Sequence, residues 1–568
     1  MQITGKGTAA NTYDAIVIGS GISGGWAAKE LTEKGLKTLV LERGRDVKHG
    51  DYPTAHSETW DFEGRGQKDP EKIKTQLKQN RTGYTTRPAS AHWFVNDLDN
   101  PYSEVKRFDW MRGYHVGGRS LMWGRHSYRW SDLDFEANAK EGIAVDWPIR
   151  YKDIEPWYAY VEEHAGITGM EEGLSQLPDS NFLPPMGLNC VEKHMKERVA
   201  AAFGGRVLTQ GRIANLSVPH KGRGSCMYRN RCIRGCPYGA YFSSQSSTLP
   251  AAVATGNMTL RPFSIVNQIL YDKETNKAKG VLVIDAETNE TIEYYAKVIF
   301  CCASALGSTF IMLNSTSDRF PDGLGNDSGE LGHNLMDHHF QIGARGVYPG
   351  FSDKYYKGRR PGGVYIPRFR NVDKESTRQD YVRGFGYQGS ASRSSWSRSV
   401  RELSKFGVDM KTELFEPGPW RMGLTAFGEC LPYHDNKAYL NHEVKDKWGQ
   451  PTFTFDCEFK DNEQKMRADM QNSAVEMLEA AGFEEVTPYD NVGAPGLGIH
   501  EMGTARMGRN PKTSVLNKWN QVHAVKNVYV TDGACMTSAS CVNPSLTYMA
   551  LTARACDHAV NELKKGNL

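Results

Sequence analysis

YDAIVIGSGISGGWAAKELTEKGLKTLVLERG, residues Tyr13 to Gly44, is the stretch that decides how the N-terminal part of the chain folds. Residues 15–18 are an apolar run of the length of a buried parallel strand, and residues 37–41 are a second one. Between them stand a G-x-G-x-x-G turn and apolar residues at helical spacing, which stop at Gly35. Strand, glycine turn, helix and strand in this order predict a βαβ unit that binds a dinucleotide.

Each glycine of the turn has a physical role in that prediction. Gly19 permits the tight turn, Gly21 lets the backbone approach a pyrophosphate, and Gly24 lets the helix pack closely on the strand. The N-terminus of the helix offers free N–H groups and a positive dipole end to the phosphate. Glu42 lies 18 residues after Gly24, where a carboxylate accepts ribose hydroxyls. The alternative is a glycine-rich turn that binds nothing.

The composition fits a globular enzyme with two or more domains. The chain has 568 residues, of which 39% are hydrophobic and 11% aromatic. A net charge of +3 is too small to indicate nucleic acid or an anionic membrane as a partner. We expect no transmembrane segment, because no run of eighteen apolar residues occurs, and we find no signal peptide pattern. Two locations stay open: the cytoplasm or, by co-export with a partner subunit, the periplasm.

Patterns further along the chain indicate more of the same architecture and a second domain. Four more β segments are expected, at residues 259–271, 279–285, 297–302 and 528–530. Residues 340–460 alternate aromatic and polar side chains between many turn signals, which predicts an antiparallel sheet and a substrate-binding domain. Residues 465–481 are expected to form an amphipathic helix. Asn543 and Pro544 are the cap and first residue of a long C-terminal helix.

Three of the eleven cysteines stand in a spacing typical of metal ligands. Cys226, Cys232 and Cys236 form a C-x5-C-x3-C-P run, in which Gly235 and Pro237 shape the turn. Thiolates select zinc or iron–sulfur clusters, and cluster runs commonly end in Cys-Pro. Zinc normally takes four ligands, and no fourth cysteine or histidine is near in sequence. Zinc with a distant fourth ligand and reduced structural cysteines remain as alternatives. Four arginines around the run would offset thiolate charge: Arg223, Arg229, Arg231 and Arg234.

Six motifs, in order along the whole chain, resemble those of the glucose–methanol–choline (GMC) oxidoreductases. They are the N-terminal glycine turn, Gly117-Gly118, CCASALGS at 301–308, GELGHNLMDHH at 329–339, HEMGTARMG at 500–508, and VTDGA…NPSLTYMALTARA at 530–555. The resemblance implies an α/β fold with two domains and oxidation of an alcohol carbon. A discontinuous, Rossmann-like FAD-binding domain is expected at 1–135, 215–335 and 490–568. A substrate-binding domain with an antiparallel sheet is expected at 136–214 and 336–489.

The resemblance also implies roles for single residues. His500 is expected to be the base that takes the hydroxyl proton, because histidine titrates near neutrality. Asn543 is expected to orient the hydroxyl, or only to cap the helix. We expect His338 and His339 to be structural. Five more residues are expected near FAD by their place in the family motifs: Gly117, Gly118, Val266, Asp532 and Pro544.

FAD is expected to be noncovalent. In related enzymes a histidine in the Gly-Gly segment carries the flavin, whereas Met122 and Trp123 fill that neighbourhood here. His115 and His126 are the nearby alternatives.

The cysteine run is similar to that of the FAD sugar dehydrogenases of this family that carry a [3Fe-4S] cluster. This implies a sugar or glycoside substrate, a small helper subunit and a cytochrome-type electron acceptor. The expected reaction is oxidation of a glucoside at C3. The rivals are C1 or C2 oxidation of an aldose or gluconate, and an oxygen-using pyranose oxidase. A non-catalytic assembly subunit is disfavoured because His500 and Asn543 are present.

Overall fold

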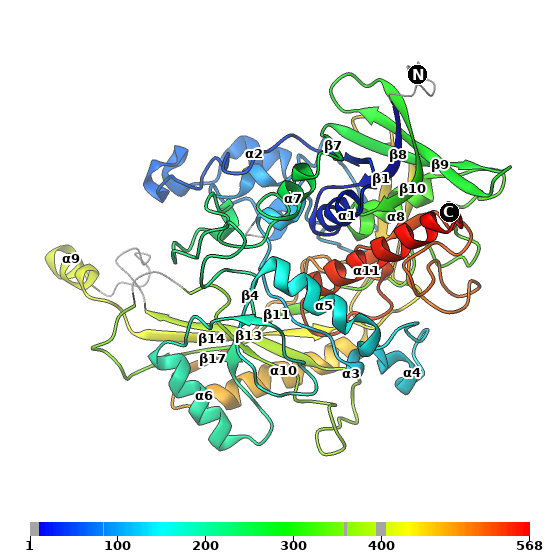
Figure 1. Cartoon of the computed structure of the whole chain (residues 1–568). Coiled ribbons are helices and arrows are strands. Elements are labelled where there is room, and N and C mark those ends of the chain that lie inside the picture. The colour runs from blue at the N-terminus through cyan, green and yellow to red at the C-terminus, as the bar shows by residue number, and fades with distance from the viewer. Residues whose placement is uncertain (1–10, 83–84, 357–359, 394–404) are drawn as a thin grey trace.

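The structure, a computed structural model, describes residues 11–82, 85–356, 360–393 and 405–568. Two sheets dominate the described chain (Figure 1). The larger sheet lies at the upper right of that view and the second sheet at its lower edge, with helices α5 (Tyr151–Ala165) and α11 (Ser545–Lys564) between them.

Seven strands form the larger sheet. Its order is β7-β2-β1-β10-β9-β8, with β18 beside the end of β10. The strands β7, β2, β1, β10 and β18 pair in parallel, whereas β9 pairs antiparallel with both β10 and β8. The bounds are β1 (Thr12–Ile18), β2 (Thr38–Leu41), β7 (Met258–Arg261), β8 (Ser264–Asp272), β9 (Lys277–Asp285), β10 (Thr291–Cys301) and β18 (Val528–Val530).

Side-chain alternation explains how this sheet is covered on both faces. Ala15 and Val17 of β1 share a core with α1 (Ile22–Glu33) and α11. Ile16 and Ile18 point to the opposite face and share a core with α8 (Ala305–Asn314) and with β9. Helix α1 also packs against α7 (Thr248–Ala254), and α5 packs against α11. Such two-sided burial is what a parallel sheet requires.

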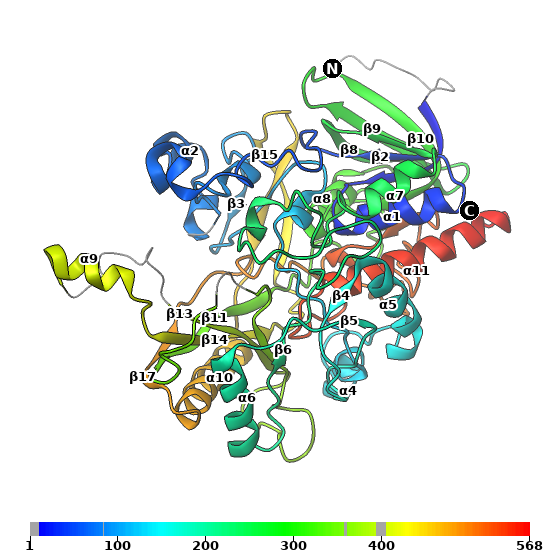
Figure 2. The ribbon, with the colours of Figure 1, turned by 60° about the vertical axis from the view of Figure 1, so that its left-hand side comes forward.

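The second sheet is antiparallel throughout. Its order is β17-β11-β14-β13-β12-β6. Helices α10 (Asp461–Ala480) and α6 (Cys190–Ala202) cover one face and share its hydrophobic core (Figure 2). The opposite face turns toward the rest of the molecule and lines a cavity. The bounds are β6 (Thr209–Gln210), β11 (His338–Tyr348), β12 (Val364–Ile366), β13 (Phe385–Arg393), β14 (Trp420–Glu429) and β17 (Glu484–Asp490).

Smaller elements connect these two layers. Strands β15 (Lys437–Lys445), β16 (Pro451–Asp456) and β3 (Ser103–Glu104) form one small sheet, and β15 packs against α8. Strands β4 (Ile167–Thr168) and β5 (Phe182–Leu183) form another. The short helices are α2 (Pro70–Thr75), α3 (Asp132–Phe135), α4 (Ala137–Glu141) and α9 (Gly407–Phe415). In the part of the chain that is described, no helix is long and apolar enough to cross a membrane.

The predicted fold class is confirmed: an α/β protein with a parallel, Rossmann-like unit and a second, antiparallel sheet. The division of the chain into an FAD-binding and a substrate-binding domain stays a prediction. Strands β15 and β16 stand inside the predicted substrate domain, yet β16 pairs with β3 of the predicted FAD domain.

Candidate active site

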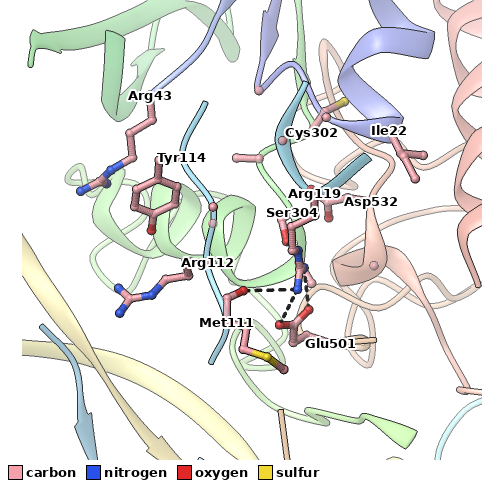
Figure 3. A pocket seen from close by; sticks show the side chains of 18 of the residues that line it. Ile22, Arg43, Met111, Arg112, Tyr114, Arg119, Cys302, Ser304, Glu501 and Asp532 are labelled. Atoms are coloured by element: carbon pink, nitrogen blue, oxygen red, sulfur yellow. Dashed lines mark hydrogen bonds and ion pairs between the residues drawn. The ribbon is translucent and has the colours of Figure 1, made fainter. Parts of the chain in front are cut away.

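The carboxyl ends of four parallel strands meet at one deep cavity. Gly19 follows β1, Glu42 follows β2, Cys302 follows β10 and Asp532 follows β18, and all four line the cavity. Figure 3 shows the side chains around it, with Arg43 and Tyr114 on one side and Arg119 and Asp532 on the other. In open α/β sheets this edge is where ligands bind.

The glycine turn has the shape that a nucleotide cofactor needs. Gly19 has a φ of +98°, and a Cβ added there would lie 2.5 Å from the carbonyl oxygen of Cys302. A Cβ on Gly24 would lie 1.9 Å from the carbonyl oxygen of Gly19, so only glycine lets α1 approach β1 this closely. A Cβ on Gly21 would meet no atom within 4 Å, so its backbone is open to the cavity. The turn therefore fits the pyrophosphate of FAD.

Glu42 lies in the cavity wall beside that turn. Its carboxylate accepts hydrogen bonds from the backbone N–H and the hydroxyl of Ser20, and from the N–H of Gly44 at 2.9 Å. Burial raises the pKa of Glu42, and these hydrogen bonds oppose the rise. The carboxylate is thus fixed at the place where the sequence puts the ribose acceptor.

Most of the other predicted cofactor residues also reach this cavity. Gly118, Val266 and Asp532 line it, together with Gly19, Gly21 and Glu42. Gly24, Gly117 and Pro544 are not in its wall. Gly117 donates its N–H to the hydroxyl of Ser20, and Pro544 is the N-cap of α11, between two residues that line the cavity. Burial raises the pKa of Asp532 to about 6.

An arginine holds the segment of the predicted base against the sheet. Arg119 donates to both carboxylate oxygens of Glu501, at 3.1 and 2.7 Å, and to the hydroxyl of Ser304 at 2.9 Å (Figure 3). Bidentate pairs of this kind restrict orientation as well as distance. On the same wall, the buried hydroxyl of Tyr548 has no hydrogen-bond partner among the described residues, which suits a polar ligand.

The structure brings His500 and Asn543 together from positions 43 residues apart. His500 Nε2 lies 3.4 Å from Asn543 Nδ2, and both residues line the cavity. Asn543 Oδ1 accepts a hydrogen bond of 2.7 Å from Gln388 Nε2 on β13. Because its oxygen is engaged by Gln388, the Asn543 amide turns its N–H group toward His500.

His338 determines which nitrogen of His500 carries the hydrogen. His338 Nε2 lies 3.3 Å from the carbonyl oxygen of Ala539, which can only accept, so this nitrogen carries a hydrogen. Burial lowers the pKa of His338 to about 4, so the neutral ring has a bare Nδ1 at pH 7. That Nδ1 lies 2.9 Å from His500 Nδ1, which must therefore be the donor.

The consequence is a free lone pair on His500. Burial, chiefly, lowers the pKa of His500 well below its ordinary value, so the ring is neutral with its hydrogen on Nδ1. His500 Nε2 then carries a lone pair directed at the N–H group of Asn543. A hydroxyl placed here can donate to His500 and accept from Asn543.

Asp337 positions the loop that carries His500. Its carboxylate accepts hydrogen bonds from the backbone N–H groups of Gly496 and Gly498 at 2.8 Å and of His500 at 3.0 Å. Burial, with the nearby charge of Glu501, raises the pKa of Asp337 to about 7. Sequence reasoning had treated this loop as structural and missed both Asp337 and His338. The available signal was the D-H-H run itself, in a motif that the family resemblance had already marked.

The two histidines considered for a flavin link differ in position. His126 lines the cavity, and its Nδ1 lies 3.0 Å from the hydroxyl of Tyr128. His115 is fully buried and does not line the cavity. Met122 and Trp123 do line it, as the sequence argument for a noncovalent cofactor requires.

A second cavity adjoins the first, and residues 122–126 line both. Cys226, Cys232 and Cys236 lie in the wall of this second cavity. Within the described ranges, however, no three His, Cys, Asp or Glu side chains are placed to hold a metal ion. The structure therefore lends no support to a metal centre at these thiols, and we assign no step to one.

Comparison with known proteins decides the family. Family models described as GMC oxidoreductase match residues 13–340 and 432–552. The chain belongs to the GMC oxidoreductase family. It is an FAD-dependent oxidoreductase that acts on CH–OH groups, as the motifs predicted.

The relatives of this GMC oxidoreductase include enzymes with different substrates. It is 29% identical to 2-methyl-1,2-propanediol dehydrogenase of Mycolicibacterium austroafricanum, over 97% of this chain and 96% of that one. It is 26% identical to the fructose dehydrogenase large subunit of Gluconobacter japonicus, over 97% and 98%. The solved structure of pyridoxine 4-oxidase from Mesorbium loti matches with a TM-score of 0.59 and 14% identity, over 96% and 98%, which shows a shared fold.

Proposed function

We propose that this GMC oxidoreductase is a sugar dehydrogenase that oxidises a secondary hydroxyl of a pyranoside, at C3 of a glucoside, to a ketone. The observation that carries the proposal is the pairing of His500 Nε2 with Asn543 Nδ2 in the wall of the cofactor cavity. Gln388, which orients Asn543, lines the second cavity, so a substrate there reaches the pair. The fructose relative named above supports a sugar as substrate.

The residues of the pair divide the work on the hydroxyl. Asn543 Nδ2 donates a hydrogen bond to the substrate oxygen and orients it. His500 Nε2 accepts the hydroxyl proton as the C–O bond gains double-bond character. When bound, FAD supplies the acceptor for the hydride that leaves the same carbon. The alcohol thus loses one proton to His500 and two electrons with the second hydrogen, which balances its oxidation to a carbonyl.

Two features of the wall favour this proton transfer. Helix α11 begins beside Asn543, and its N-terminus has no side-chain cap, so its positive dipole end favours negative charge at the cavity. His338 keeps the hydrogen of His500 on Nδ1, so the base is ready in the correct tautomer. Asp337 holds the backbone of the same loop.

Product analysis tests the proposal. The holoenzyme is incubated with methyl glucoside, glucose or gluconate and an artificial electron acceptor, and the products are identified by mass spectrometry and NMR. We expect a 3-keto product from methyl glucoside. Oxidation only of glucose or gluconate at C1 or C2 would replace the C3 assignment. Rapid oxygen consumption without the acceptor would indicate an oxidase.

We further propose that electrons leave the enzyme to a cytochrome-type protein with the help of a small subunit. The fructose relative, described as a large subunit, supports such an assembly. Co-export with that subunit would place the enzyme in the periplasm, and the cytoplasm is the alternative location. A [3Fe-4S] cluster on the three cysteines stays a prediction of the sequence, for which iron and sulfide analysis is the test. Size analysis of native complexes tests the assembly.

A further inference from the structure

The second cavity has two different walls. One is the open face of the antiparallel sheet, where Phe340 and Phe427 stack with ring centroids 5.0 Å apart and Thr425 adds a hydroxyl. The other is formed by the cysteine loop, of which residues 226–233, 235 and 236 line the cavity. Since Gln388 belongs to the sheet wall and bonds Asn543, the cavity leads to the catalytic pair. A substrate that presents its hydroxyl to His500 extends its remaining groups into this space.

The second cavity has an excess of positive charge. Its lining among the described residues holds four arginines and no aspartate or glutamate: Arg125, Arg229, Arg231 and Arg360. The cofactor cavity is different, because four arginines there are matched by Glu42, Asp446, Glu501 and Asp532. The excess of positive charge is therefore a property of the substrate side alone.

Two of these arginines form ion pairs with carboxylates that do not line the cavity. Arg231 pairs with Glu58 and Arg360 with Glu192, and neither glutamate lines the cavity. The other two have only uncharged partners. Arg125 donates to Asn215 Oδ1 at 3.2 Å, and Arg229 donates to the carbonyl oxygen of Ala55 at 2.6 Å. Within the described residues no carboxylate pairs with Arg125 or Arg229.

The positive charge of Arg125 and Arg229, which line the cavity without a carboxylate partner among the described residues, is therefore left for a ligand. A guanidinium recognises a carboxylate or phosphate by two parallel hydrogen bonds, and a partly enclosed site strengthens the attraction.

We propose that the second cavity binds the anionic group of an acidic sugar, with Arg229 and Arg125 as its recognition residues, while a hydroxyl of the same sugar lies at His500 and Asn543. This inference rests on the proposed sugar dehydrogenase function and names the substrate class of that site. A carboxylate and a phosphate share the required chemistry, and the experiment distinguishes them.

The experiment measures flavin reduction in the anaerobic holoenzyme by stopped-flow absorbance. The substrates are methyl glucopyranoside, methyl glucopyranosiduronate and methyl glucopyranoside 6-phosphate. We expect one anionic substrate to exceed the neutral one in kcat/KM by about ten- to a hundredfold, the range of a charge-assisted hydrogen bond. The anionic group, carboxylate or phosphate, that gives the larger increase in kcat/KM is the group that the site recognises. In Arg229→Gln this preference should fall by about tenfold or more.

A matched variant and a binding measurement complete the test. Arg234 stands on the same loop but lines neither cavity and donates to the carbonyl oxygen of Ser57, so Arg234→Gln should keep the preference. His500→Ala, which should not turn over, allows the Kd of methyl glucopyranosiduronate to be measured from the flavin spectrum with and without Arg229→Gln. We expect weaker binding in the double variant.

Each contrary outcome has a distinct meaning. Equal kcat/KM for neutral and anionic sugars would overturn the inference and leave the proposed function standing. An equal loss of preference in Arg234→Gln and Arg229→Gln would also overturn it, since general surface charge would then suffice. If none of the three sugars reduces the flavin, the proposed function fails and the inference falls with it.

Discussion

Replacing His338 tests whether the tautomer of His500 is under control of its neighbour. His338→Ala removes the acceptor that lies 2.9 Å from His500 Nδ1. A buried donor without a partner costs about 1–3 kcal/mol, so the Nδ1–H tautomer of His500 loses up to that much of its advantage over the tautomer with its hydrogen on Nε2. In that tautomer Nε2 cannot accept the hydroxyl proton. The rate of flavin reduction should therefore fall by roughly 5- to 150-fold.

The assay is anaerobic stopped-flow reduction at saturating methyl glucoside, with FAD content and Tm measured for every variant. His338→Asn is the matched rescue, because its side-chain oxygen can accept from His500 Nδ1–H about where the ring nitrogen did. We expect the asparagine variant to recover most of the lost rate, although both variants lose the bond to Ala539. Equal impairment of the two variants, or a wild-type rate in His338→Ala, would refute the reasoning.

Three further predictions follow from the site. FAD should be released by acid or heat, because the Gly-Gly segment offers Met122 and Trp123 where a linking histidine would stand; flavin that stays with the denatured chain would point to His126. The low pKa values of His500 and His338, the latter about 4, keep both rings neutral, so neither imidazole should protonate as the pH falls from 7 to about 5; a histidine NMR titration that places His500 near the ordinary histidine value would contradict this. Anaerobically purified protein should contain iron and sulfide if the cysteine prediction holds, and Cys232→Ser should lose them while its flavin is still reduced by substrate; iron-free wild-type protein would end that prediction.

Local patterns made the N-terminal unit predictable. The spacing of apolar residues and three glycines reports β1, the turn and α1 directly, since each depends on neighbours in sequence. Strand β10 shows the limit: a strand was expected only at residues 297–302, whereas β10 runs from Thr291 to Cys301 and its first half pairs with β9. The register of the second sheet could not be predicted, because pairings such as Val364 with Gln210 join segments that are distant in sequence.

Only part of the candidate site could be predicted, because its residues come from segments that are distant in sequence. His500 and Asn543 stand in family-like motifs, and the structure places them side by side. Their supporting residues come from the second sheet: Gln388 is 155 positions from Asn543, and His338 is 162 positions from His500. Gln388 belongs to none of the motifs, and the motif at 329–339 that holds His338 does not report that this ring meets His500. Four arginines around the cysteines were noticed in the sequence, but that Arg229 and Arg231 lie in the wall of the second cavity depends on the fold.

The central claim is that His500 Nε2 takes the hydroxyl proton of the substrate. The most direct measurement is the rate of flavin reduction by methyl glucoside in the anaerobic His500→Ala holoenzyme, compared with wild type at equal FAD content. Loss of a general base typically costs about 10²–10⁴-fold, and we predict a decrease in that range with FAD still bound. A reduction rate within a few-fold of wild type in the FAD-loaded variant would contradict the account.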